Sequence, residues 1–132
     1  MWTKISALLV ALTLCAPVAA QSFRAENHVV VTGVTGGFEI SSGGGYGARG
    51  MWCAAADYAR DVLGAAWADR IYIAQGRSPG IGQRAPVRFT LDSTGLNPKS
   101  VFIVGMSLRQ AGSNLTVSHA YQFCTDAKVI NR

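Results

Sequence analysis

The sequence contains no apolar run long enough to cross a bilayer. Its most apolar segment covers residues 5–14, whereas a transmembrane helix needs about 20 residues. Lys4 precedes this segment, and the small-residue stretch PVAA at 17–20 follows it. A positive charge, a short apolar core and an A-x-A-like end are typical of a secretory signal. We therefore expect residues 1–20 to be a cleaved signal peptide and residues 21–132 to form one domain that is exported to the periplasm or the cell exterior.

Cysteine is scarce. The chain has three cysteines, and Cys15 lies within the expected signal, which leaves Cys53 and Cys124. In an oxidising compartment, an even number of cysteines favours a disulfide. A bridge between these two would close a loop of roughly 70 residues and stabilise the fold by about 4 kcal/mol on the chain-entropy model. We predict a Cys53–Cys124 disulfide.

Metal-ligating and catalytic side chains are also few. His28 and His119 are the only histidines, and neither stands at metal-ligand spacing with the cysteines. The acidic residues show no pairing that indicates glycoside chemistry. The sequence contains no G-x-S-x-G nucleophile elbow. The sequence therefore predicts no metal site and no cofactor.

The excess of positive charge is mild. The chain has 12 Lys+Arg and 7 Asp+Glu, and Lys4 belongs to the expected signal. The other cations are dispersed along the chain, which argues against a dense nucleic-acid-binding patch. General electrostatics favour attraction to an anionic polymer of the cell envelope. Another exported protein is the alternative partner.

Changes of hydrophobic period divide the chain into expected elements. A flexible leader is expected at 21–27, a helix at 51–66, and strands at 28–32, 38–40, 70–75, 86–92, 100–108 and 114–124. The later connections are too short for crossover helices, so neighbouring strands are expected to be antiparallel. The predicted fold is α+β, with one amphipathic helix packed on an antiparallel sheet of about four to six strands in two layers.

The expected helix carries one apolar stripe. Its members recur at three- and four-residue spacing and are Trp52, Ala55, Ala56, Ala59, Val62, Leu63 and Ala66. Four other residues, Asp57, Arg60, Asp61 and Gly64, fall on the opposite side. We therefore expect the stripe to face the sheet and Asp57 and Asp61 to face solvent.

The segment before this helix matches the dinucleotide fingerprint as Gly45-x-Gly47-x-x-Gly50. In that motif, glycines let backbone amides approach a pyrophosphate at a helix start. The motif also needs a parallel β-α-β unit and an acidic residue that ends its second strand. Asp69 instead precedes the next expected strand. We interpret the glycines as a turned entry into the helix, without a nucleotide cofactor.

A cysteine hydrolase is the alternative function. Cys53 lies in the first turn of the expected helix, where the helix dipole stabilises a thiolate. His119 lies on the last expected strand, on the face that the helix would cover. This layout resembles the general plan of papain-like and amidase-type cysteine enzymes. The resemblance rests on two residues, and it implies a nucleophilic Cys53 and a basic His119, as in an amidase or peptidase.

Ligand contacts are expected around the glycine-rich segment, where aromatic side chains bracket the helix, and in the long connection 76–85. Loops on a rigid sheet are frequent recognition elements. The candidate ligand-binding residues are Tyr46, Arg49, Trp52, Arg77 and Arg84. The preferred function is that of a small exported, disulfide-stabilised domain that acts without catalysis as a binding or accessory protein.

Overall fold

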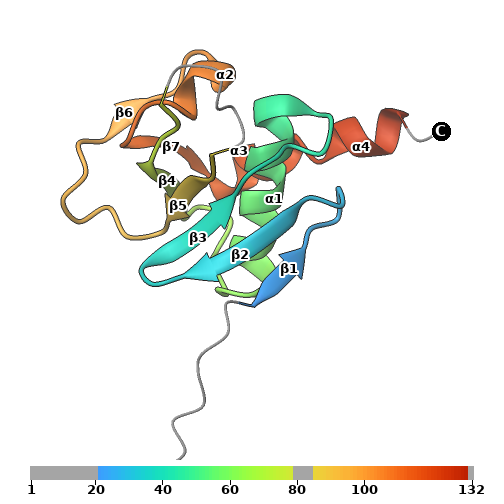
Figure 1. Ribbon diagram of the computed structural model, residues 1–132, viewed down its shortest axis with the longest axis horizontal. Helices are drawn as coiled ribbons and strands as arrows, with labels where there is room; N and C mark the ends of the chain where they lie inside the picture. Colours follow the sequence, from blue (N-terminus) through green and yellow to red (C-terminus); the bar gives the residue numbers. More distant parts are fainter. Residues whose placement is uncertain (1–20, 79–84, 131–132) are drawn as a thin grey trace, which may run out of the picture.

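The computed structural model describes residues 21–78 and 85–130, which form one mixed sheet and four helical segments (Figure 1). The strands are β1 (Ser22–Arg24), β2 (Val30–Val34), β3 (Gly37–Ile40), β4 (Arg70–Gln75), β5 (Val87–Thr90), β6 (Lys99–Ser100) and β7 (Ser113–Thr116). The helices are α1 (Gly47–Asp61), α2 (Val104–Ser107), α3 (Val117–Gln122) and α4 (Thr125–Ile130). The expected signal peptide, residues 1–20, lies outside the described residues.

The described strands form one sheet in the order β1-β2-β3-β5-β4-β7-β6. Its neighbouring strands are antiparallel, except for the parallel pair of β6 and β7. The α+β class is therefore confirmed. The sheet has seven strands rather than about four to six, and three shorter helices accompany α1.

Helix α1 connects β3 to β4 and lies against the sheet (Figure 1). Both strands pair antiparallel with β5, which lies between them. They are therefore parallel to each other without being neighbours, so the unit differs from the β-α-β unit of dinucleotide-binding folds. The second strand also ends in Gln75 rather than in an acidic residue.

The helix is buried over most of its length rather than along one stripe. Every residue from 50 to 59 is buried, and Asp57, expected on the solvent side, is only 7% exposed. Val62 and Leu63, expected inward, lie beyond the end of the helix and are exposed. The N-terminal segment contributes to the burial of Asp57, because the backbone N–H of Glu26 donates to its carboxylate at 2.7 Å, and α3 also packs against α1.

That N-terminal segment was expected to be a flexible leader, but residues 22–24 form β1 at one edge of the sheet. The segment continues over the start of α1, where the side chain of Asn27 donates to the carbonyl of Gly50 at 2.9 Å. Asn27 is buried, and His28 then turns the chain with a φ of 67°. This segment therefore lies against α1 at Gly50 and Asp57.

The expected last strand is wrong beyond Thr116. Strand β7 stops there, and the Thr116 hydroxyl accepts a hydrogen bond from the backbone N–H of His119 at 3.1 Å, which caps the start of α3. Val117, Ala120 and Cys124 all face the core. Their spacing of three and four residues is helical, although alternate residues of the same segment also fit a strand.

The expected central strand at 100–108 is also wrong. Only Lys99–Ser100 pair with β7, and the chain then forms the single-turn helix α2. Ser107 explains this local fold, because its hydroxyl accepts a hydrogen bond from the buried indole N–H of Trp52 at 3.0 Å. A continuous apolar run does not distinguish a buried strand from a helix by periodicity. Here the polar Ser107 at its end determines how the segment packs.

Candidate functional site

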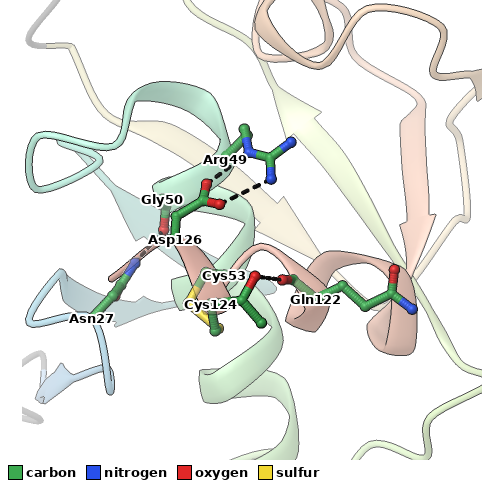
Figure 2. A network of polar contacts seen from close by, with 8 residues as sticks. Asn27, Arg49, Gly50, Cys53, Gln122, Cys124 and Asp126 are labelled. Atoms are coloured by element: carbon green, nitrogen blue, oxygen red, sulfur yellow. Dashed lines mark hydrogen bonds and ion pairs between the residues drawn. A yellow bond between two sulfur atoms is a disulfide. The ribbon is translucent and has the colours of Figure 1, made fainter. Parts of the chain in front are cut away.

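The disulfide predicted from the sequence is present. Cys53 and Cys124 are joined with a Cα–Cα distance of 5.0 Å, and both side chains are buried. Cys124 lies between α3 and α4, so the bridge ties the C-terminal helices to the first half of α1 (Figure 2). No thiol is available at Cys53 in this state, and His119 is exposed on α3. The structure therefore does not bring these two residues together as a thiolate and a base.

Arg49, a candidate ligand-binding residue, forms an ion pair at the same junction. Its guanidinium donates to both carboxylate oxygens of Asp126, at 2.7 and 3.0 Å (Figure 2). It also lies over the Phe123 ring, 4.6 Å from the ring centroid. The hydrogen bond from Arg49 lowers the pKa of Asp126, and the same bond raises the pKa of Arg49. The ion pair therefore stabilises the charged forms of both Arg49 and Asp126.

The two aromatic candidates, Trp52 and Tyr46, occupy different environments. Trp52 is fully buried, and its ring packs edge-to-face on Phe89 with the ring centroids 5.2 Å apart. Because it fills the core, it does not form an aromatic rim. Tyr46 is half-buried and precedes α1, where its backbone N–H donates to the carbonyl of Gly43 at 3.1 Å.

The glycine-rich segment makes a tight turn into α1. Gly47 has a φ of 63°, in the left-handed region that favours glycine. A Cβ atom on Gly50 would lie 2.2 Å from the carbonyl oxygen of Gly43, so this close approach also requires glycine. The first turn of α1 contains no acidic residue, and the residue before it forms no side-chain cap. The positive end of the α1 dipole is therefore not neutralised by its own side chains.

A cleft of about 220 Å³ adjoins this turn. We call it the basic cleft; its described lining residues are Gly43, Gly47, Ala48, Met51, Arg77, Ser78, Gly105, Leu108 and Arg109. None of these residues is acidic. Arg77 was expected to contact a ligand, and it is the one described candidate that lines this cleft. Arg84 lies outside the described residues.

Arg77 is held in the cleft by neutral partners. Its side chain donates to the carbonyl of Ala85 at 2.7 Å and to the carbonyl of Ser41. Burial lowers the pKa of Arg77, because it removes water from around the charged guanidinium. Among the described residues, no carboxylate forms an ion pair with this cation. The guanidinium is therefore held in place by carbonyl groups, and no described carboxylate neutralises its positive charge.

Arg109 is the second cation of the basic cleft and was missed in the sequence. Strand β4 ends beside it, because Gly76 lets the chain pass close to residues 108 and 109. A Cβ atom on Gly76 would lie 2.6 Å from the carbonyl carbon of Arg109. The side chain of Arg109 is exposed and forms no ion pair within the described part of the chain. One feature of the sequence could have indicated an unpaired cation here: residues 93–125 include no Asp or Glu.

A second, larger cavity of about 500 Å³ shares no lining residue with the basic cleft. It is lined by Arg70, Tyr72, Pro98, Lys99, Ser100, Val101, Asn114, Leu115 and His119. Asn114 organises its polar groups: it accepts a hydrogen bond from Arg70 at 2.9 Å and donates to the carbonyl of Lys99 at 3.2 Å. His119 therefore belongs to a polar cavity without acidic lining residues.

No group of three or more His, Cys, Asp or Glu residues in 21–78 and 85–130 is arranged to hold a metal ion. In the same part of the chain, no helix has the length and apolar character that crossing a bilayer requires.

Comparisons with known proteins gave no match to a protein-family model, a curated protein or a solved structure.

Proposed function

We propose that this protein is a small exported domain that acts without catalysis and binds anionic groups in the basic cleft. The observation that carries this proposal is the pairing of Arg77 and Arg109 in one cleft that has no acidic lining residue. The first turn of α1 adds the positive end of a helix of 15 residues to the same cleft. These three features favour a negatively charged ligand.

Export is supported by the signal-like residues 1–20 and by the disulfide. Structural disulfides persist in oxidising compartments, and the Cys53–Cys124 bridge is buried in the core. A protein placed there meets the anionic polymers of the cell envelope, which we propose as its ligand class. The absence of catalysis is proposed because the bridge occupies the sulfur that a cysteine hydrolase would need.

The proposal is tested with dextran sulfate as a soluble polyanion and uncharged dextran of the same length as the matched probe. Isothermal titration calorimetry should detect binding of dextran sulfate alone, and added salt should weaken it. Arg109→Gln should weaken that binding several-fold, since it removes a cation from the basic cleft. Arg24→Gln makes the same charge change on β1, at the opposite edge of the sheet from β6, and should leave the affinity unchanged.

The two variants distinguish a defined cleft from general attraction. An equal loss in Arg24→Gln and Arg109→Gln would show that only the net charge matters, and the cleft would not be the binding site. Binding of both dextrans with equal affinity would contradict an anionic ligand. Thermal unfolding of each variant checks that a lost affinity does not reflect a lost fold.

A further inference from the structure

Three apolar side chains near the start of α2 are unusually exposed. Phe102 is 92% exposed, Ile103 63% and Met106 49%. We call these three residues the apolar tip. Single exposed apolar residues are ordinary on a soluble protein, but a contiguous group typically marks an interaction surface. Ser100, Val101 and Ser107 lie beside the tip and line a shallow groove of about 170 Å³ with it.

The apolar tip is held in place by the fold. Ser107 joins α2 to the core through its hydrogen bond with Trp52, and Leu108 is buried directly after it. Strand β6 fixes the other side by pairing with β7 at the edge of the sheet. In Figure 1, β6 and α2 lie together at the top of the molecule. The exposed side chains therefore extend from an anchored turn.

Along the chain, a cation flanks the apolar tip on each side. Lys99 precedes it and Arg109 follows it, and both side chains are exposed. Arg109 also lines the basic cleft, and Lys99 lines the larger polar cavity. The whole segment 93–125 lacks acidic residues. Apolar side chains between cations match the layers of an anionic bilayer, in which charged phosphates lie above the acyl chains.

We propose that the apolar tip inserts into the surface of an anionic lipid bilayer, with Lys99 and Arg109 at the level of the lipid phosphates. This inference rests on the proposed function, since it identifies the anionic group of the basic cleft as a lipid phosphate. A second copy of the chain fits this surface poorly, because pairing two tips would bring Lys99 and Arg109 close to the same cations of the partner. An anionic bilayer offers negatively charged phosphates to the two cations and apolar acyl chains to the apolar tip.

The test measures co-flotation of the oxidised full domain with two kinds of vesicle. One is made of phosphatidylcholine alone, and the other is phosphatidylcholine mixed with anionic phosphatidylglycerol. We expect binding to the anionic vesicles. Phe102→Ala should weaken it by about tenfold or more, since it removes the aromatic side chain that the proposed insertion would bury among the acyl chains. Leu63→Ala is the matched apolar control, because Leu63 is 46% exposed beyond the end of α1, and it should bind as the wild type does.

The charge requirement is tested separately. Lys99→Gln should weaken binding to anionic vesicles about fivefold, whereas Arg24→Gln should not change it. Equal binding to both vesicle types, or equal losses in Lys99→Gln and Arg24→Gln, would overturn the proposed orientation. Failure to bind vesicles, with dextran sulfate still bound at the basic cleft, would overturn the lipid inference and leave the proposed function intact.

The reverse result is also informative. Vesicle binding that depends on Phe102 and Lys99, without any binding of dextran sulfate, would support the lipid surface and contradict a soluble-polymer ligand. Self-association in size-exclusion chromatography that disappears in Phe102→Ala, without vesicle binding, would assign the apolar tip to a protein interface and overturn the inference.

Discussion

Two regions of this molecule differ in whether their polar and charged side chains have partners within the fold. Around the disulfide, charged and polar groups bind one another: Arg49 pairs with Asp126, and the Tyr121 hydroxyl donates to Glu26 at 2.6 Å. That hydrogen bond, followed by burial, raises the pKa of Tyr121 to about 12. Around α2, between residues 99 and 109, exposed cations and apolar side chains have no such partners in the described chain.

This difference suggests that one region contributes to stability and the other to ligand binding. Side chains that satisfy one another inside a fold contribute to its free energy of unfolding. Side chains that a fold positions without partners contribute little to stability and are available for a ligand. Substitutions near the disulfide should therefore change stability, and substitutions of the exposed side chains near α2 should change binding.

Removal of the disulfide should have the largest effect. The double variant Cys53→Ala/Cys124→Ala should lose about 4 kcal/mol of unfolding free energy, because the bridge spans 71 residues and restricts the unfolded chain. A domain of this size has only about 5–15 kcal/mol in total. Guanidinium chloride unfolding measures the loss, and reduction of the wild type should give a similar one. Alkylation of both cysteines in the native, unreduced protein would contradict the bridge.

The disulfide was predictable because it depends on composition and compartment rather than on local conformation. Its geometry was not: an alternating strand would have pointed Cys124 away from α1. The Thr116 cap turns that segment into α3, and the helix then brings Cys124 to Cys53. The fold class was predictable from the hydrophobic periodicity of the sequence. The burial of Asp57 was not, because it depends on an N-terminal segment that is distant in sequence.

The candidate site was only partly predictable. Arg77 was expected in a recognition loop, but Arg109 joins it only because β4 ends against residues 108 and 109. The packing of Trp52 in the core and the ion pair of Arg49 were not predictable, since aromatic and cationic residues near a glycine loop also suit a binding site. Those outcomes depend on Phe89 and Asp126, which are far away in sequence.

Ser107→Ala should have the next largest effect, because Ser107 links the two regions. The substitution leaves the buried indole N–H of Trp52 without its hydroxyl acceptor, which should cost about 1–3 kcal/mol. Chemical denaturation measures this loss. Ser100→Ala is the matched control, since Ser100 is exposed on β6 and should stay within about 0.5 kcal/mol of the wild type. Equal stability of both variants would mean that α2 is not anchored through Trp52.

Asp57→Asn should have a smaller effect, with a defined pH dependence. Burial raises the pKa of Asp57 above its ordinary value of 3.8, so the folded state binds this proton more tightly than the unfolded state. The wild type therefore loses stability as pH rises through the interval from 3.8 to the raised pKa. Asparagine can still accept the hydrogen bond from Glu26. The variant should gain most relative to the wild type at neutral pH and lose that advantage toward pH 3.

Asp92→Asn is the control of opposite sign. Hydrogen bonds from Thr94 lower the pKa of Asp92, so its carboxylate contributes stability above 3.8 that is lost as pH falls through the lowered pKa. This variant should be less stable than the wild type at neutral pH and converge with it in acid. Urea unfolding at several pH values measures both differences. Parallel pH profiles of the two variants would contradict the assigned burial of Asp57.

Phe102→Ala and Arg109→Gln should have the smallest effects on stability, within about 0.5 kcal/mol of the wild type. Phe102 is 92% exposed, so its removal takes almost no apolar area out of the folded core, and Arg109 has no ion-pair partner in the described chain to lose. Thermal and denaturant unfolding measure this directly. A loss above about 1 kcal/mol in either variant would show that the α2 region is part of the stabilising core, and the contrast between the two regions would then disappear. Near-equal stability together with weakened binding would instead assign these side chains to recognition.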